Sequence, residues 1–264
     1  MEHGLYSMEY FVNESSIVRR IWGKGDTILF IFAGAAAEFA LNKAVDWLYY
    51  TGRLPADPLG RLFSTVGYAR GIVFSKHDDA LQVIDKIAQI HKAVEDSRGA
   101  QIPDWSYRDV LFMLIDYSIR SFELLERKLN AEEKEAVYEV FRRMGTRMGI
   151  KELPPSYDEW IPVRKDHLAR DLIKSKYTTD LFRQYRKHLG SFRYWILKQA
   201  QIMVVPEKVR RDLNLSRTQL LRPVLQIYKW TRLLRIDQKL RNLILPKAYK
   251  SQVIDLDTLH QVQS

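Results

Sequence analysis

The sequence predicts an all-α protein that folds as a single globular, multi-helix domain. Apolar residues recur at helical spacing through most of the 264 residues. No pair of alternating strands joined by Asn-Gly or Asp-Gly indicates a β-hairpin. The apolar fraction of 46% and the aromatic fraction of 12% are those of a packed protein and not of a disordered chain. An all-helical chain of this length can bury one sizeable core as one domain.

The first part of the chain is expected to hold two helices followed by a loop. Apolar spacing predicts a helix over residues 16–23 and another over 27–50, with Asp26 as the N-cap of the second. The apolar run 28–37 is too short to cross a bilayer and predicts a buried core helix. The segment TGRLPADPLGRL is rich in glycine and proline, so we expect a loop there and a short helix over 62–73.

The next helix carries a histidine on its apolar face. Ser75 and Asp78 resemble a capping box ahead of ALQVIDKIAQIHKAVED. His91 lies at helical spacing from the apolar residues of this helix, so its imidazole is expected to point into the core. The apolar residues of this stripe are Val83, Ile84, Ile87, Ile90 and Val94.

The remaining helices follow from the same periodicity. The segment AEEKEAVYEVFRRMG predicts a helix whose first carboxylates suit the helix dipole and which Gly145 and Gly149 are expected to break. Pro206 bounds the last long helix, and the basic stretch beyond it is expected to be helical on both sides of Pro223. The other expected helices cover residues 107–129, 158–173 and 179–204.

Positive charge gathers late in the chain. The net charge is +10, and 12 basic against three acidic side chains lie between Glu207 and Lys250. Such a segment suits either a packed helix with a basic outer face or an amphipathic helix on anionic lipid, and the sequence leaves both open. Nucleic acid is less favoured because no reader motif accompanies the charge. The N-terminus lacks the pattern of a secretory signal, so we expect a cytoplasmic protein with peripheral membrane contact as an option.

The composition excludes several kinds of site. Without cysteine the chain has no disulfide, thiolate nucleophile or thiolate-bound metal. It also lacks a P-loop, a dinucleotide-binding glycine motif, His-Glu-x-x-His and Gly-x-Ser-x-Gly. Among six scattered histidines, only His91 combines a core-facing position with an apolar setting. A histidine of this kind is more often a hydrogen-bonded core residue than a metal ligand, and both readings stay open.

Three runs of the sequence carry a family resemblance. They are DPLGRLFSTVGYARGIVFSKHDDALQVIDKIAQIHKAVEDSRG, DWSYRDVLFMLIDYSIRSFELL and MGIKELPPSYDEW. With them the chain resembles the latex-clearing protein family of rubber oxygenases. That broad family also includes the membrane-associated, ER-bound fungal oxygenase of mycophenolic acid biosynthesis and many uncharacterised bacterial proteins. The resemblance covers residues 16–234, the expected core of a domain that spans 1–264, and overlaps the basic segment 207–250.

The resemblance implies a cofactor and the residues that hold it. It implies haem b in a buried, cofactor-sized pocket, with His91 as axial ligand to iron, and O₂ used to oxygenate or cleave an apolar or lipid-like substrate. In the segment GRLFST, Arg61 and Thr65 match the distal arginine and threonine, and Ser64 stands where rubber-cleaving members place a lysine. Arg70 is a candidate partner for a haem propionate, although Arg61 and Arg70 also fit surface arginines that answer Asp57 and Asp78.

Two departures from the family pattern bear on the substrate. Serine cannot replace lysine as an iron ligand, so rubber is not the expected substrate. Asn42 and Lys43 stand where many relatives carry a His-Pro pair. Glu38 and Asp46 are candidates for a general base, and each also fits a carboxylate that is solvated or paired with Lys43. The alternatives are a haem-free helical protein that binds a lipid-like ligand or acts as a scaffold, and a basic adaptor that contacts anionic membrane.

Overall fold

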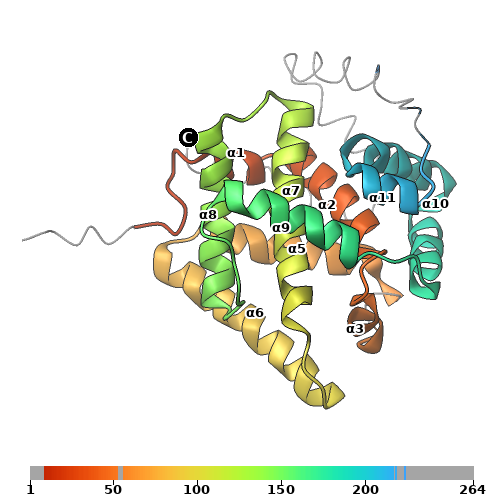
Figure 1. Cartoon of the computed structure of the whole chain (residues 1–264), viewed down its shortest axis with the longest axis horizontal. Helices are drawn as coiled ribbons and strands as arrows, with labels where there is room; N and C mark the ends of the chain where they lie inside the picture. The colour runs from red at the N-terminus through yellow and green to blue at the C-terminus, as the bar shows by residue number, and fades with distance from the viewer. Residues whose placement is uncertain (1–8, 53–55, 217, 219–222, 224–264) are drawn as a thin grey trace, which may run out of the picture.

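The computed structural model describes residues 9–52, 56–216, 218 and 223, and it confirms the all-α class. Ten helices and no strand occur in these residues, which form one compact domain (Figure 1). The helices are α1 (Ile17–Trp22), α2 (Gly25–Phe39), α3 (Val45–Tyr50), α5 (Pro58–Val73), α6 (His77–Arg98), α7 (Asp104–Leu125), α8 (Ala131–Arg147), α9 (Tyr157–Arg170), α10 (Lys176–Val204) and α11 (Glu207–Asp212).

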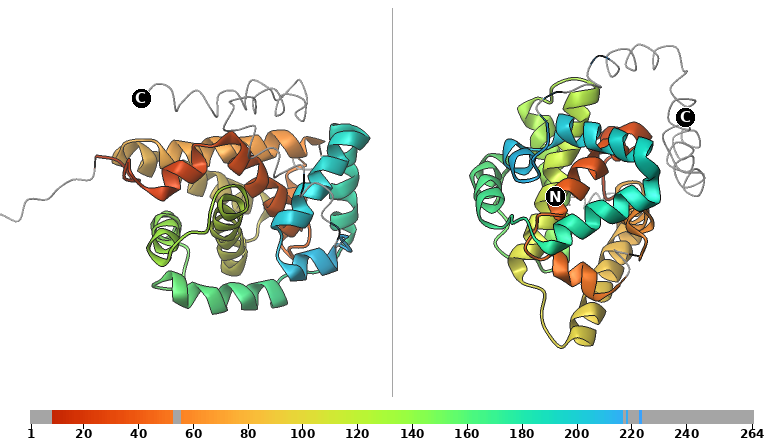
Figure 2. Two further views of the ribbon diagram at one scale, coloured as in Figure 1. Left: turned by 90° about the horizontal axis from the view of Figure 1, so that it is seen from above. Right: turned by 90° about the vertical axis from the view of Figure 1, so that its right-hand side faces the viewer.

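The core is built around α2 and α7. These two helices make the most extensive helix–helix contact, and α2 also packs against α10 and α1, as the further views show (Figure 2). The α7 residues Phe112, Ile115 and Phe122 are wholly buried, because apolar residues recur around most of this helix. α5 and α6 pack against one another at the edge of this core.

Local sequence signals begin and end several helices. Ser16 caps α1 by accepting from the Val18 N–H, and Asn130 and Glu133 form a capping box at α8. Gly99 ends α6 in the left-handed conformation, at φ 66°, which glycine adopts without strain. Ser156 accepts from the Glu159 N–H at the start of α9.

The helix expected over residues 27–50 is wrong, because the chain forms two helices there. Lys24, and not Asp26, is the N-cap of α2. The break after Phe39 is held by tertiary hydrogen bonds: the Lys43 N–H donates to the Asp171 carbonyl at 3.0 Å, and the Ile173 N–H donates to the Leu41 carbonyl at 2.7 Å. These bonds draw the connection into a bridge with the segment after α9, so it cannot continue the helix.

Other boundaries differ for similar reasons. α5 begins at Pro58, where the Asp57 carboxylate caps the Gly60 N–H at 2.8 Å, and so it is four residues longer than expected. The capping box at Ser75 does not form, because Lys76 is the N-cap of α6 and Asp78 is therefore only the second residue of the helix; the preceding segment is instead held by the Phe11 N–H, which donates to the Ser75 carbonyl. α7 ends at Leu125, earlier than expected.

One expected break is a close-packed position instead. Gly145 lies inside α8, where a Cβ atom would come within 2.6 Å of the Leu111 side chain. Gly149, at φ 78°, follows the end of that helix. α10 is interrupted at Gly190, whose φ of 72° is not helical.

The structure also bears on the late, basic part of the chain. Most of the segment 207–250, including the helices expected on both sides of Pro223, lies outside the described residues. Among the residues that are described, no helix is both long and apolar enough to span a membrane.

Candidate functional site

The three residues predicted from the segment GRLFST lie together on one face of α5. One Nη of Arg61 donates to the Thr65 hydroxyl at 3.0 Å and to the Ser64 hydroxyl at 3.3 Å. Both hydroxyls in turn donate to the Arg61 carbonyl, at 3.1 and 2.8 Å respectively. This follows from helix geometry, since residues three and four apart are neighbours on a helix surface. The hydroxyls hold the guanidinium against α5 in a defined direction.

His91 lies on α6, beside this face of α5. Its Nδ1 is buried and has no hydrogen-bond partner among the described residues. Burial, and after it the positive charge of Arg61, lower the pKa of His91 to about 4, although Glu95 partly opposes the shift. The imidazole is therefore neutral at physiological pH, which is the form that binds metals.

Tyr107 and Glu95 hold the imidazole from the other side. The Tyr107 ring lies against the His91 ring, with centroids 5.2 Å apart. The Tyr107 hydroxyl donates to the Glu95 carboxylate at 3.1 Å, and burial together with this carboxylate raises the Tyr107 pKa. The Ile102 N–H also donates to Glu95, at 2.8 Å. The start of α7 is thus tied to α6 one turn from His91.

His91 is less deeply buried than its place on the apolar stripe of α6 predicts. The histidine inside the core is His167, which is 4% exposed, whereas His91 is half-buried and its neighbour Ile90 is 38% exposed. The reason is that α6 packs against α5 and α8 and leaves its other side to solvent.

Arg70 is not brought together with the other candidates. Nine residues separate it from Arg61, which places the two on opposite faces of α5. Arg70 is 5% exposed and its guanidinium lies over the Phe74 ring, 5.2 Å from the centroid. Its assignment to a propionate stays a prediction.

The two candidate bases lie in different surroundings. Glu38 is 1% exposed and, instead of being solvated or paired with Lys43, receives two hydrogen bonds from Arg164, at 2.6 and 2.7 Å, and one from Tyr117, at 2.9 Å. Asp46 is half-buried on α3 and pairs with Arg98 at 2.7 Å. Because Arg98 lies two turns after His91, this pair is about 10 Å along the same face of α6.

Glu38 belongs to a buried, charge-balanced network that periodicity did not reveal. Arg164 also contacts Asp116, at 3.1 Å, and Asp116 accepts from Arg120 at 2.6 Å. Although burial alone would lower it, the carboxylates of Glu38 and Asp116 raise the pKa of Arg164. Burial, and then Glu38, raise the pKa of Tyr117 well above its usual range. Two carboxylates and two guanidiniums satisfy one another here.

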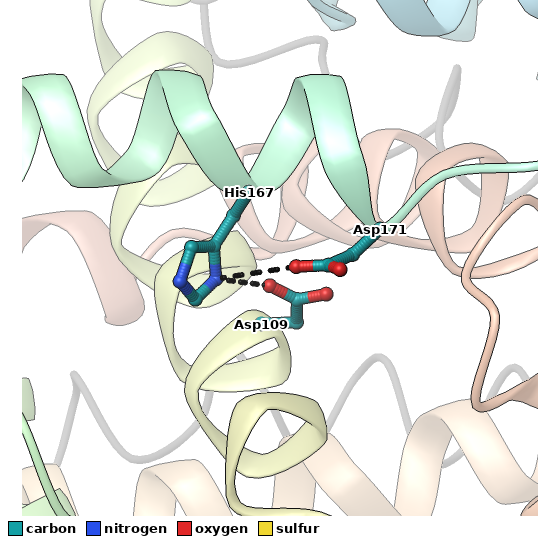
Figure 3. A group of neighbouring side chains, drawn as sticks. All are labelled: Asp109, His167 and Asp171. Carbon is teal, nitrogen blue, oxygen red and sulfur yellow. Dashed lines mark hydrogen bonds and ion pairs between the residues drawn. The ribbon is translucent and has the colours of Figure 1, made fainter.

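A second buried group joins α7 to the end of α9. The Nδ1 of His167 makes a very short contact to Asp109 and lies 4.0 Å from Asp171 (Figure 3). The Asn42 amide donates to the other oxygen of Asp109 at 2.8 Å, and Arg170 donates to Asp171 at 2.9 Å. The sequence did offer a signal for both buried groups: Asp109 and Asp116 lie two turns apart on the apolar face of α7.

Comparison with known proteins adds a family match. The family model for the catalytic domain of ER-bound oxygenase mpaB/B′ and rubber oxygenase matches residues 19–236, a range that contains every candidate site residue described in this subsection. No curated protein and no solved structure matches the chain.

Proposed function

Because the chain belongs to the family of ER-bound oxygenase mpaB/B′ and rubber oxygenase catalytic domains, we propose that it is a haem b-dependent oxygenase of an apolar, lipid-like substrate. His91 is the proposed axial ligand. The family match covers most of the chain and agrees with the resemblance found in the sequence, so an oxygenase domain is the premise. The haem, its ligand and the substrate are the proposal.

The observation that carries the proposal is the state of His91. An axial ligand requires a neutral imidazole, and the buried Nδ1 of His91 has no hydrogen-bond partner among the described residues that would compete for it. Buried polar atoms in proteins are ordinarily hydrogen-bonded, so a buried ring nitrogen without a partner calls for a functional explanation. The neighbouring cation, Arg61, suits the negative charge of the propionates or of reduced oxygen, so these residues fit haem b. When bound, haem supplies the redox chemistry of oxygen activation.

The residues of α5 have defined tasks in this proposal. Thr65 and Ser64 orient the Arg61 guanidinium, whose positive charge would stabilise negative charge that develops on the oxygen or on the substrate. Tyr107 holds the plane of the His91 ring through its contact and through Glu95. Asp46 of α3 pairs with Arg98 on the same face of α6 as His91. It is the better candidate for a proton acceptor, because Glu38 is fully engaged by Arg164 and Tyr117.

The proposed substrate is apolar but is not rubber. Ser64 offers a hydroxyl and no amine at the position where rubber-cleaving relatives have lysine. A lipid-like substrate also agrees with peripheral contact between a cytoplasmic protein and anionic membrane, and both of these remain expectations. A pocket of cofactor size stays a prediction as well.

The decisive experiment is an absorption titration with haemin. Wild-type protein is expected to develop a Soret band at one equivalent, and His91→Ala is expected to lose it while its circular dichroism stays helical. His188→Ala, which changes another half-buried histidine on α10, is the control and should keep the band. If wild-type protein gives no band, the oxygenase proposal fails, and a haem-free protein that binds a lipid-like ligand becomes the better description.

A further inference from the structure

Asp109, His167 and Asp171 form the most deeply buried group of potential metal ligands among the described residues. Their exposures are 3%, 4% and 4%, so water does not solvate them. They come from two helices: Asp109 from α7, His167 from the last turn of α9, and Asp171 from the residue that caps it. They share no residue with the α5–α6 face, which consists of Arg61, Ser64 and Thr65 on α5 and His91 on α6.

We propose that this cluster binds one divalent first-row transition-metal ion, with Zn²⁺ as the best match. Two carboxylate oxygens and one imidazole nitrogen are ligands that Zn²⁺ accepts, and the chain has no cysteine to compete for it. The candidate fourth donor is the hydroxyl of Ser106, which lies one turn before Asp109 on the same face of α7. Its hydroxyl is buried and has no hydrogen-bond partner among the described residues.

The spacing of the ligand atoms suits a single ion. One ligand atom from each of the three residues lies within 4.8 Å of the other two, and the His167 Nδ1 lies 4.0 Å from the Asp171 oxygen. Two atoms bound at about 2.0–2.2 Å from one ion in tetrahedral geometry lie about 3.3–3.6 Å apart, so the Asp171 oxygen must move toward Nδ1 by roughly half an ångström when the ion binds. The very short Asp109–His167 contact must lengthen when the ion enters, and the proton on Nδ1 leaves to Nε2 or to solvent.

The surrounding residues are arranged as an outer layer of a metal site. Asn42 donates to the Asp109 oxygen that does not face His167, and Arg170 donates to Asp171, so both carboxylates are held in direction. With a neutral imidazole, two carboxylates balance the charge of a divalent ion. The Arg170 side chain is 51% exposed, so solvent screens its charge from the ion.

The proposed role is structural. Burial leaves the ligands closed to a substrate, while the ion would join the start of α7 to the end of α9. Through Asn42 it would also fasten the connection between α2 and α3, which the Lys43 and Ile173 backbone bonds already draw to this place. Metal binding of this kind adds to folding free energy.

The test is made on the full chain, purified without a histidine tag. Elemental analysis of wild-type protein is expected to find about one Zn²⁺ per chain, and after EDTA dialysis added Zn²⁺ should raise Tm by about 5 °C. Asp171→Asn, which keeps the shape of the side chain, should lose both effects. Asp166→Asn, which changes an exposed carboxylate of the same helix, is the matched control and should keep them.

Two results would overturn the proposal. Wild-type protein that holds no ion and does not respond to Zn²⁺ or Mn²⁺ would show that the cluster is a hydrogen-bonded ion pair alone. Zn²⁺ that binds equally to wild type and Asp171→Asn would be adventitious. The haemin titration tests His91 independently of this cluster, so the haem proposal and the metal proposal can each fail without the other.

Discussion

The α5–α6 face and the polar interior around Arg164 are opposite solutions for placing charged groups in a helical protein. Around Arg164 the carboxylates of Glu38 and Asp116 each pair with a guanidinium, and Glu38 by itself accepts three hydrogen bonds. On the α5–α6 face, Arg61 is held by two hydroxyls and His91 keeps a buried nitrogen without a partner among the described residues. Complete pairing stabilises a fold, whereas a group left without a partner keeps its capacity to bind something else.

Removal of Arg164 should have the largest effect on stability. Arg164→Met leaves Glu38 and Asp116 buried without their shared cation, which is expected to lower the free energy of unfolding by about 3–5 kcal/mol. Urea denaturation followed by circular dichroism measures it. The control is Arg183→Met, whose side chain is 72% exposed and pairs with Asp180, and whose effect should stay below about 1 kcal/mol. Equal effects of the two variants would mean that the buried network contributes no more than a surface ion pair.

Alanine substitutions at two glycines, one in each region, test how closely the two regions are packed. A Cβ at Gly34 of α2 would lie 2.3 Å from the buried Tyr117 ring, so Gly34→Ala should destabilise by about 1–3 kcal/mol. Gly67 of α5 has no atom within 4 Å of its ideal Cβ, so Gly67→Ala should stabilise by about 0.5–1 kcal/mol through helix propensity. Thermal unfolding of both variants checks the signs. A destabilising Gly67→Ala would indicate that the α5 face is more closely covered than the structure shows.

The family resemblance singled out the residues of the α5–α6 face, and local contacts explain why they lie together; their role stays a prediction. Arg61, Ser64 and Thr65 are neighbours by helical spacing, and α6 follows α5 directly in the chain. The buried groups could not be predicted in the same way, because Glu38 and Arg164 are 126 residues apart and Asp109 and His167 are 58 apart. Periodicity shows which face of a helix is buried, but it does not show which distant side chain meets it there.

The same distinction explains the wrong helix boundaries. Spacing alone extends one helix over residues 27–50, since apolar residues continue past Phe39. Besides the backbone bonds of Lys43 and Ile173, the Asn42 side chain holds the break: its amide donates to Asp109 and its oxygen accepts from the Ala44 N–H at 2.8 Å. A tertiary partner far along the chain therefore overrides a local helical preference.

A substitution of His91, whose expected effect is the smallest of all at neutral pH, tests the cost of keeping this imidazole without a hydrogen-bond partner. Its pKa is about 4 in the folded protein and about 6.5 when unfolded, so the unfolded chain takes up a proton first as the pH falls. The stability that the neutral His91 allows is fully present above pH 6.5 and is lost as the pH falls toward 4. In haem-free protein, His91→Leu removes this loss, so the variant should be close to wild type at pH 7.5 and more stable by about 1–2 kcal/mol at pH 5. His188→Leu controls for a general effect of removing a histidine. If His91→Leu destabilises the protein equally at both pH values, the imidazole is a satisfied packing residue, and the contrast between the two regions disappears.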